Sequence, residues 1–152
     1  MKIHISNKAE IMSLLCTNNY FYQHEAVYGD GLSTYDVHDK LHLEHPKIFE
    51  ELCWRVLNIV GRDYKFLYMW ANVYHHGSYV KPHSHFDERY PEGLCGVYYL
   101  KKPNDSGNLI INNQLIVIDE NDLVIFGNKD IHSTEKNKSN ESRIVISFNL
   151  IK

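Results

Sequence analysis

Short apolar runs separated by turn residues make up the chain from residue 64 onward. Within these runs apolar and polar positions alternate, which is typical of strands that bury one face. The candidate strands are residues 65–74, 79–83, 94–101, 108–112, 114–118, 122–126, 131–134 and 143–150. Short strands at this close spacing predict a mainly β fold, an antiparallel jelly roll or barrel. The polar run 135–142 before the last strand is expected to be a solvated hairpin loop.

Apolar residues recur at helical spacing in two segments of the first third of the chain. The first segment is residues 6–17, and the second is residues 46–60. Pro46 stands at the first position of the second segment and Gly61 follows its last, as expected for the start and stop of a helix. Residues 20–40 show no clear period, and we expect an ordered loop with at most short strands there.

No linker, internal repeat or low-complexity tract divides the helical part of the chain from the β part. We therefore predict one domain over residues 1–152. Residues 1–63 form a helical N-terminal cover packed on one sheet, and residues 64–152 form the β core. A chain of 152 residues is long enough to bury a full core without disulfides or a structural metal.

The charge pattern and the cysteines exclude several function classes. The chain has 16 lysines and arginines, 19 aspartates and glutamates, and no basic block longer than Lys101-Lys102. Nucleic-acid binding is not expected, because phosphate contacts need clustered cations. No apolar run is long enough for a membrane span or a secretory signal. The 3 cysteines are widely spaced, which fits reduced thiols and a cytoplasmic location.

The 10 histidines are the compositional outlier, and two of them belong to a candidate metal motif. His85 and Asp87 are two residues apart at the end of a predicted strand, so both side chains point to one face. His132 follows a later apolar strand and its turn. Two histidines and a carboxylate on one side of a metal leave positions open for a cosubstrate and dioxygen, as in non-haem Fe(II) oxygenases. The sequence therefore predicts a metal site of His85, Asp87 and His132.

The last predicted strand carries a second polar feature. By alternation Arg143 shares a face with Val145, Ser147 and Asn149, so a guanidinium and a hydroxyl project together into the barrel. The nearby sequence offers no evident carboxylate for a buried guanidinium, and a dicarboxylate cosubstrate would supply one. The alternative is a surface arginine paired with Glu141.

Six segments stand in an order that is typical of one enzyme family. They are residues 70–74, 79–87, 95–100, 106–109, 121–126 with His132, and 143–150. In these segments the sequence resembles the Fe(II)- and 2-oxoglutarate-dependent oxygenases, especially the prolyl-hydroxylase-like branch and related uncharacterised phage and bacterial oxygenases. The resemblance implies a double-stranded β-helix and a dioxygenase that hydroxylates a small-molecule or peptide substrate with O2, releasing succinate and CO2.

For the metal, the resemblance implies that His85, Asp87 and His132 bind iron. Some relatives carry an HxH pair in this strand, which makes His83, His85 and His132 the alternative ligand set. If Asp87 is the ligand, His83 is a residue of the second coordination sphere or of the substrate mouth.

For 2-oxoglutarate, the resemblance implies that Arg143 pairs with the far carboxylate. Tyr99 matches a position that often contacts the same carboxylate. Tyr74 and Ser147 complete the candidate cofactor-binding residues. Both tyrosines could equally be core aromatics with satisfied hydroxyls.

Two other functions fit part of these residues. A cupin-type metal enzyme, either a three-His dioxygenase or an isomerase, explains the histidines but gives Arg143 and Tyr99 no purpose. A non-catalytic ligand-binding jelly roll treats the histidines as structural. The substrate itself is not predicted, because loops decide specificity on such scaffolds. The pocket mouth is expected to include Tyr79, Lys81, Arg89, Tyr90 and part of residues 28–39.

Overall fold

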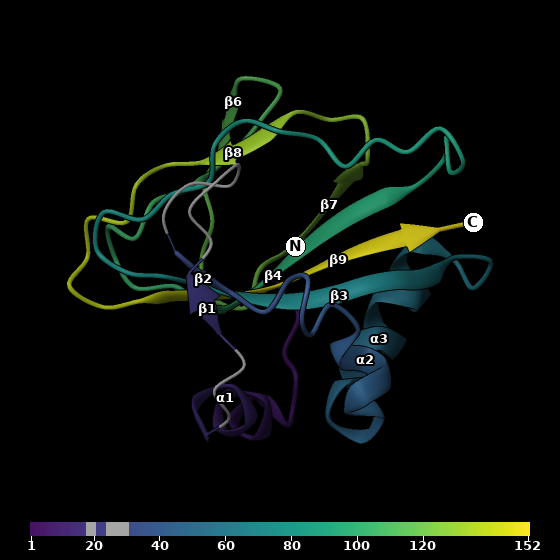
Figure 1. The fold of residues 1–152 in the computed structure, drawn as a ribbon, viewed down its shortest axis with the longest axis horizontal. Coiled ribbons are helices and arrows are strands. Elements are labelled where there is room, and N and C mark those ends of the chain that lie inside the picture. Colours follow the sequence, from purple (N-terminus) through teal and green to yellow (C-terminus); the bar gives the residue numbers. More distant parts are fainter. Residues whose placement is uncertain (18–20, 24–30) are drawn as a thin grey trace.

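The computed structural model describes residues 1–17, 21–23 and 31–152, and two antiparallel sheets face each other in its β part (Figure 1). The larger sheet has the strand order β1-β2-β3-β9-β4-β7, and the smaller has the order β6-β5-β8. The strands are β1 (Tyr22–Gln23), β2 (Leu32–Ser33), β3 (Lys65–Tyr74), β4 (Leu94–Lys101), β5 (Leu109–Ile111), β6 (Gln114–Ile116), β7 (Leu123–Gly127), β8 (His132–Thr134) and β9 (Arg143–Ile151). This architecture confirms the predicted double-stranded β-helix.

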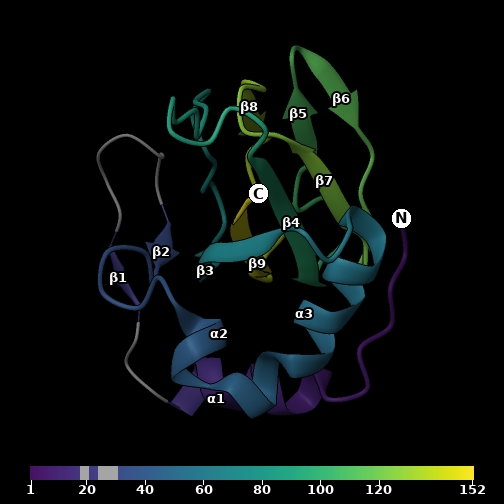
Figure 2. The same ribbon diagram turned by 90° about the vertical axis from the view of Figure 1, so that its right-hand side faces the viewer.

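The N-terminal helices cover the outer face of the larger sheet, as predicted (Figures 1 and 2). The helices are α1 (Lys8–Thr17), α2 (Leu41–Glu44) and α3 (Pro46–Val60). Pro46 begins α3 and Gly61 follows it with a φ of 113°, a backbone conformation that glycine adopts readily. The short helix α2 was not predicted. None of the helices in the described ranges is long and apolar enough to cross a membrane.

The loop predicted over residues 20–40 is described only in part. Residue 20 and residues 24–30 lie outside the described residues. The rest contributes the short strands β1 and β2, and β2 pairs with β3 at the edge of the larger sheet.

β9 separates two apolar cores. One face presents isoleucine, phenylalanine and leucine side chains to the helices, namely Ile144, Ile146, Phe148 and Leu150. The other face presents Arg143, Val145, Ser147 and Asn149 to a cavity between the sheets. The predicted alternation along this strand is therefore confirmed, and it brings the polar residues into the interior.

Residues 79–83 do not form the predicted regular strand. His83 and His132 exchange two backbone hydrogen bonds of 3.1 and 2.9 Å. The carbonyl of Val80 accepts from the backbone N–H of Thr134 at 3.1 Å, and the N–H of Val80 donates to the side-chain Oγ1 of Thr134 at 3.0 Å. Between these contact points this segment has two residues and β8 has one, so the segment bulges. The proline in the bulge has no N–H to donate, which interrupts the ladder. The segment nevertheless follows β8 closely and brings His83 beside His132.

Candidate active site

Three histidines meet at the cavity between the sheets. His83 lies after the bulge, His85 follows it, and His132 opens β8. One ring nitrogen of each lies within 4.8 Å of the other two. The ring centroids are 4.2 Å apart for His83 and His132, 5.0 Å for His83 and His85, and 5.2 Å for His85 and His132. Three imidazoles at this spacing can hold one metal ion.

Backbone carbonyls orient two of these rings. Nδ1 of His83 is 2.8 Å from the carbonyl oxygen of Lys81, and Nδ1 of His132 is 3.2 Å from that of Asp130. A carbonyl oxygen can only accept, so Nδ1 carries the proton in both rings. Nε2 then keeps its lone pair, which is the usual state of a histidine that binds a metal.

Burial keeps the three imidazoles neutral. Loss of hydration, with repulsion between the rings, lowers the pKa of His85 to about 3 and the pKa of His132 to about 4. Burial also lowers the pKa of His83. Because neutral imidazole is the form that binds metals, the cluster is suited to a cation even below neutral pH.

The metal-free protein is expected to lose stability as the pH falls from about 7.5 to 5. In this range the histidines of the unfolded chain, with an ordinary pKa of 6.5, take up protons while His85 and His132 in the folded protein do not. Protonation therefore favours the unfolded state, by a few kcal/mol in total at about 1.4 kcal/mol per pKa unit. Urea unfolding at both pH values measures the loss. A His85→Gln, His132→Gln double variant should show a flatter dependence of the unfolding free energy on pH. An unchanged pH dependence would contradict the conclusion that these two histidines stay neutral in the folded protein.

Asp87, the carboxylate of the sequence motif, lies outside the three-histidine cluster. Arg89 binds it in a fork: Nε donates to Oδ1 at 3.0 Å, and Nη2 donates to Oδ2 at 2.6 Å. These hydrogen bonds hold the pKa of Asp87 below its usual value. The carboxylate thus has a cationic partner of its own near the surface.

Arg143 is fully buried at the start of β9. Nη1 donates to the carbonyl oxygen of Ser106 at 2.5 Å, and Nη2 donates to Oγ1 of Thr134 at 3.1 Å. Nε is buried and has no hydrogen-bond partner among the described residues. The ring of Tyr74 lies against the guanidinium, with its centroid 4.6 Å from Cζ. These contacts fix the guanidinium in place and leave part of its donor capacity unused.

Within residues 1–17, 21–23 and 31–152, no carboxylate lies within ion-pair distance of Arg143. Glu141, the surface partner considered from the sequence, pairs instead with Lys101 at 2.9 Å. Burial lowers the pKa of Arg143, which means that the enclosed positive charge is unfavourable without a counter-charge. An anion bound in the cavity would supply the missing partner.

Two buried tyrosines lie near this guanidinium. Tyr74 and Tyr99 line the same cavity as Arg143 and are 9% and 1% exposed. Burial raises the pKa of Tyr74 to about 12 and that of Tyr99 still higher, so both hydroxyls stay protonated. Together with Arg143 they form a group of donors suited to a carboxylate.

One cavity, of about 80 Å³, is lined by both the histidines and Arg143. The distance between Arg143 and the histidine cluster can be judged from β8. The hydroxyl of Thr134 contacts Arg143, and His132 lies two residues before Thr134 on the same strand. Two residues of a β-strand span roughly 6–7 Å and point to the same face. This separation is close to the length of a five-carbon dicarboxylate.

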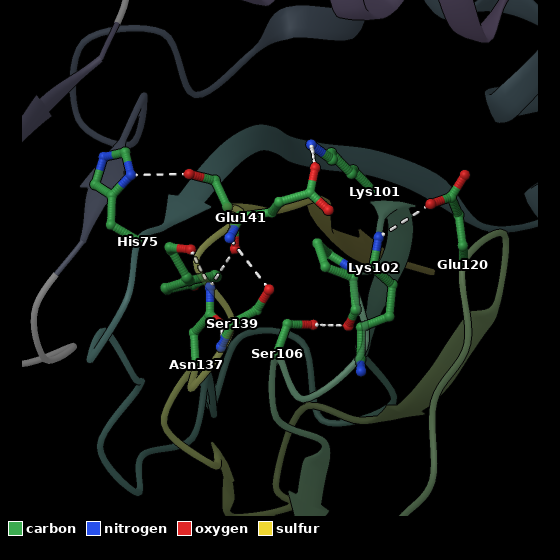
Figure 3. A network of polar contacts seen from close by, with 11 residues as sticks. His75, Lys101, Lys102, Ser106, Glu120, Asn137, Ser139 and Glu141 are labelled. Carbon is green, nitrogen blue, oxygen red and sulfur yellow. Dashed lines mark hydrogen bonds and ion pairs between the residues drawn. The ribbon is translucent and has the colours of Figure 1, made fainter.

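A network of polar contacts joins the loop of residues 135–142 to the ends of β3 and β4 (Figure 3). Asn137 is fully buried, and its Nδ2 donates to the carbonyl oxygens of Tyr74 at 2.8 Å and Glu141 at 2.9 Å. The prediction that residues 135–142 form a solvated loop is therefore wrong at Asn137. This side chain turns inward because it pairs backbone carbonyls that would otherwise be buried unsatisfied.

Gly107→Ala is expected to destabilise the protein by about 1–3 kcal/mol more than Gly77→Ala. Gly107 has a φ of 83°, and a Cβ there would lie 2.6 Å from the carbonyl oxygen of Glu135 and 3.0 Å from Nη1 of Arg143. Gly77 has a φ of 84°, and no atom of the described residues lies within 4 Å of its Cβ position, so an alanine there carries the same backbone strain without the collision. Urea unfolding compares the two variants. Equal losses of unfolding free energy would show that Gly107 is not tightly packed against Arg143 and the Glu135 carbonyl.

The cavity also contains residues that the sequence motifs missed. Thr134 and Asn72 line it, and alternation with His132 on β8 was the available signal for Thr134. In the predicted mouth, residues 31–33 and Tyr35 line the cavity, whereas residues 28–30 lie outside the described residues. The other predicted mouth residues, Tyr79, Lys81, Arg89 and Tyr90, are not among the residues that line it.

The sequence matches no protein-family model and no curated protein. Several solved structures share its fold. The non-haem α-ketoglutarate-dependent epimerase SnoN of nogalamycin biosynthesis superposes with a TM-score of 0.78 at 12% identity, over 99% of this chain and 75% of that chain. HygX from Streptomyces hygroscopicus, with nickel and 2-oxoglutarate bound, gives a TM-score of 0.72 at 11% identity, over 98% and 79% of the two chains.

A third structure with this fold is a prolyl hydroxylase from Trichoplax adhaerens in complex with a peptide of hypoxia inducible factor. Its TM-score is 0.69 at 16% identity, over 98% of this chain and 80% of that chain. At these identities the similarity shows the fold alone. The chain therefore has the double-stranded β-helix that 2-oxoglutarate and Fe(II) oxygenases use.

Proposed function

We propose that this protein is an Fe(II)- and 2-oxoglutarate-dependent oxygenase that hydroxylates a small-molecule or peptide substrate. The observation that carries the proposal is Arg143, which is fully buried without an acidic partner in the described residues. It lies about one dicarboxylate length from three histidines that can hold a metal. HygX, which shares the fold, binds nickel and 2-oxoglutarate, which supports the same pairing of ligands here.

We propose His83, His85 and His132 as the metal ligands. Their neutral rings, two of them with Nδ1 tied to backbone carbonyls, suit a divalent transition metal such as iron. The set His85, Asp87 and His132 stays a prediction from the sequence. It requires Asp87 to exchange its hydrogen bonds with Arg89 for the metal.

Arg143, Tyr74 and Tyr99 are proposed to hold the far carboxylate of 2-oxoglutarate. The guanidinium supplies charge, and the two neutral phenols supply additional donors. Ser147, four residues from Arg143 along β9, is a further proposed contact for the opposite end of 2-oxoglutarate, because its hydroxyl accepts a hydrogen bond from Nδ2 of Asn72 at 3.3 Å and keeps its own proton to donate. All four side chains lie on strands of the larger sheet, so their positions are fixed before a ligand binds.

Iron and its cosubstrate would supply the oxidation: a substrate C–H group, O2 and 2-oxoglutarate give the hydroxylated product, succinate and CO2. The protein binds, orients and excludes water. Apolar side chains that include Leu109, Phe126 and Val145 form the cavity wall between the polar groups. Water is thereby kept from the reacting atoms, which strengthens the charge pairing at Arg143.

A three-His dioxygenase of the cupin type is the second candidate, because the cluster of His83, His85 and His132 contains no carboxylate. Such an enzyme would use the histidines in the same way. Among the described residues it would leave the buried charge of Arg143 with no carboxylate in ion-pair contact, since Glu135 acts on it only from a longer distance. Binding of 2-oxoglutarate therefore separates the two candidates.

Under argon, the Fe(II)-loaded protein is expected to develop a charge-transfer absorption band when 2-oxoglutarate is added. On admission of O2, succinate should form slowly even without the substrate, because unproductive turnover still consumes the cosubstrate. Glutarate, which lacks the keto group that chelates the metal, is the matched control and should give neither signal. Bound iron with no band and no succinate would favour the three-His dioxygenase.

A further inference from the structure

The cavity continues beyond the histidines on the side away from Arg143. In the register of β3 and β9, Trp70 lies opposite Ser147 and Tyr68 lies opposite Asn149. Asn149 is six residues from Arg143 along β9, a separation of roughly 20 Å. Asn149 is therefore out of reach of a dicarboxylate held by Arg143, and the space beside it is free for a second molecule.

An aromatic corner forms one wall of this end. Tyr35 and Trp70 have ring centroids 5.0 Å apart at an interplanar angle of 63°, and the centroid of Trp70 is 5.8 Å from that of His85. Hydrogen bonds of Ser33 fix the backbone at Tyr35. The hydroxyl of Ser33 donates to Oδ1 of Asn72 at 2.7 Å and accepts from the backbone N–H of Tyr35 at 3.1 Å. A fixed pair of rings beside the histidines offers a surface for the flat face of a ligand.

Asn149 gives the same end an unused hydrogen-bond acceptor. Its side chain lines the cavity, and its Oδ1 is buried with no hydrogen-bond partner in the described residues. The residue opposite it on β4 is Cys95, whose burial raises the pKa of the thiol to about 12 and keeps it neutral. A buried amide oxygen without a partner is unfavourable, and a ligand N–H or O–H would complete it.

Charge restricts the ligand further. Among the described residues that line the cavity, Arg143 is the only one with a lysine, arginine, aspartate or glutamate side chain. The proposed function assigns Arg143 to 2-oxoglutarate and the histidines to the metal. Apart from these, none of the described lining residues has a side chain that could neutralise a charged group, so a phosphate, carboxylate or ammonium beside them would enter at a large desolvation penalty.

We propose that this end of the cavity, formed by Tyr35, Trp70 and Asn149, binds an uncharged ring that donates an N–H or O–H hydrogen bond to Asn149. The ring lies against the indole and the phenol, which brings its C–H groups beside the metal-binding histidines. This substrate class rests on the proposed function, which places 2-oxoglutarate at Arg143. Two kinds of molecule contain an uncharged ring with such a donor: a sugar, through its hydroxyl groups, and a peptide, through an amide next to a ring.

The test uses zinc-loaded protein saturated with 2-oxoglutarate and measures probe binding by saturation-transfer NMR. The sugar arm compares methyl β-glucopyranoside with its glucuronide, which is charged, and with its fully O-methylated form, which has no donor. The peptide arm compares N-acetylprolinamide with N-acetylproline and with the dimethylamide. In at least one arm the neutral donor probe should bind about tenfold tighter than both analogues, and the arm that does so identifies the source.

Asn149→Leu should weaken the neutral donor probe about tenfold and leave the donor-free analogue unchanged, which a merely structural role would not do. Asn149→Asp keeps an acceptor in place and should retain the donor probe. Asn58→Leu, on the exposed face of α3, is the matched control and should change nothing.

Three results would overturn the proposal: charged analogues that bind as well as the neutral probes, a donor preference that survives in Asn149→Leu, or no binding of any neutral donor probe. The affinity for 2-oxoglutarate is measured in the same samples. If 2-oxoglutarate fails to bind, the proposed function fails, and the probe comparison is repeated with zinc alone to decide on the aromatic subsite separately.

Discussion

His132→Ala is expected to abolish the binding of Fe(II). The imidazole is one of only three proposed ligands, and its Nδ1 is already committed to a backbone carbonyl, so no other atom of the residue can replace it. Loss of a group that merely orients a ligand lowers metal affinity by about 10–100-fold. Loss of the ligand itself should therefore exceed about 100-fold. Anaerobic equilibrium dialysis should show one Fe(II) per wild-type chain and none in the variant.

The same measurement on other variants decides the ligand set. His83→Ala should be as damaging as His132→Ala, while Asp87→Ala should stay near wild type, because Asp87 is bound by Arg89 outside the cluster. The reverse ranking would establish the carboxylate as the ligand. His76→Ala is the control, since this exposed histidine bonds to the Ser139 carbonyl. Wild-type iron affinity in His132→Ala would remove the metal site from its proposed place.

The alternation of residues along a strand predicted which side chains face the site in strands that are buried on both faces. In β9 the isoleucines and phenylalanine face the helices, so Arg143 and Ser147 have to face the cavity. The start and end of α3 were equally predictable, because Pro46 and Gly61 act through their own backbone conformations. In such segments local sequence and tertiary packing favour the same structure.

The choice between His83 and Asp87 could not be made from spacing. His83, His85 and Asp87 all occupy alternate positions, and in a regular strand all three would share one face. The segment is not regular, because it bulges before His83 and turns after Asp87, where the N–H of Tyr90 bonds to the Asp87 carbonyl at 2.9 Å. Only the pairing with β8, which is distant in sequence, shows which side chains meet His132.

Asn137 was missed for a related reason. Composition marks residues 135–142 as a solvated loop, and composition does not report which polar side chain is used by the backbone. Asn137 is buried because its amide bonds the carbonyls of Tyr74 and Glu141. Its burial depends on β3 and on the end of the loop at once, and no local pattern encodes that contact.

Arg143→Ala is expected to lower the affinity for 2-oxoglutarate by roughly 30-fold to several thousandfold, or about 2–5 kcal/mol. The variant would leave a carboxylate between Tyr74 and Tyr99 without its cation, at a position that is fully buried in the wild-type protein. Arg143→Lys should recover only part of the loss, because an ammonium cannot form two parallel hydrogen bonds with a carboxylate. Titration of the charge-transfer band under argon, at fixed iron, measures all three proteins.

Two controls separate this effect from damage to the fold. Iron affinity should be nearly unchanged in Arg143→Ala, since Arg143 is not a proposed ligand. Arg143→Met keeps most of the side-chain volume beside Tyr74 and should lose 2-oxoglutarate to a similar extent, whereas Arg89→Ala removes an arginine outside the cavity and should lose none. Unchanged affinity in both Arg143→Ala and Arg143→Met would mean that the buried guanidinium serves only the carbonyl of Ser106 and the hydroxyl of Thr134. The three-His dioxygenase would then be the better explanation of the histidine cluster.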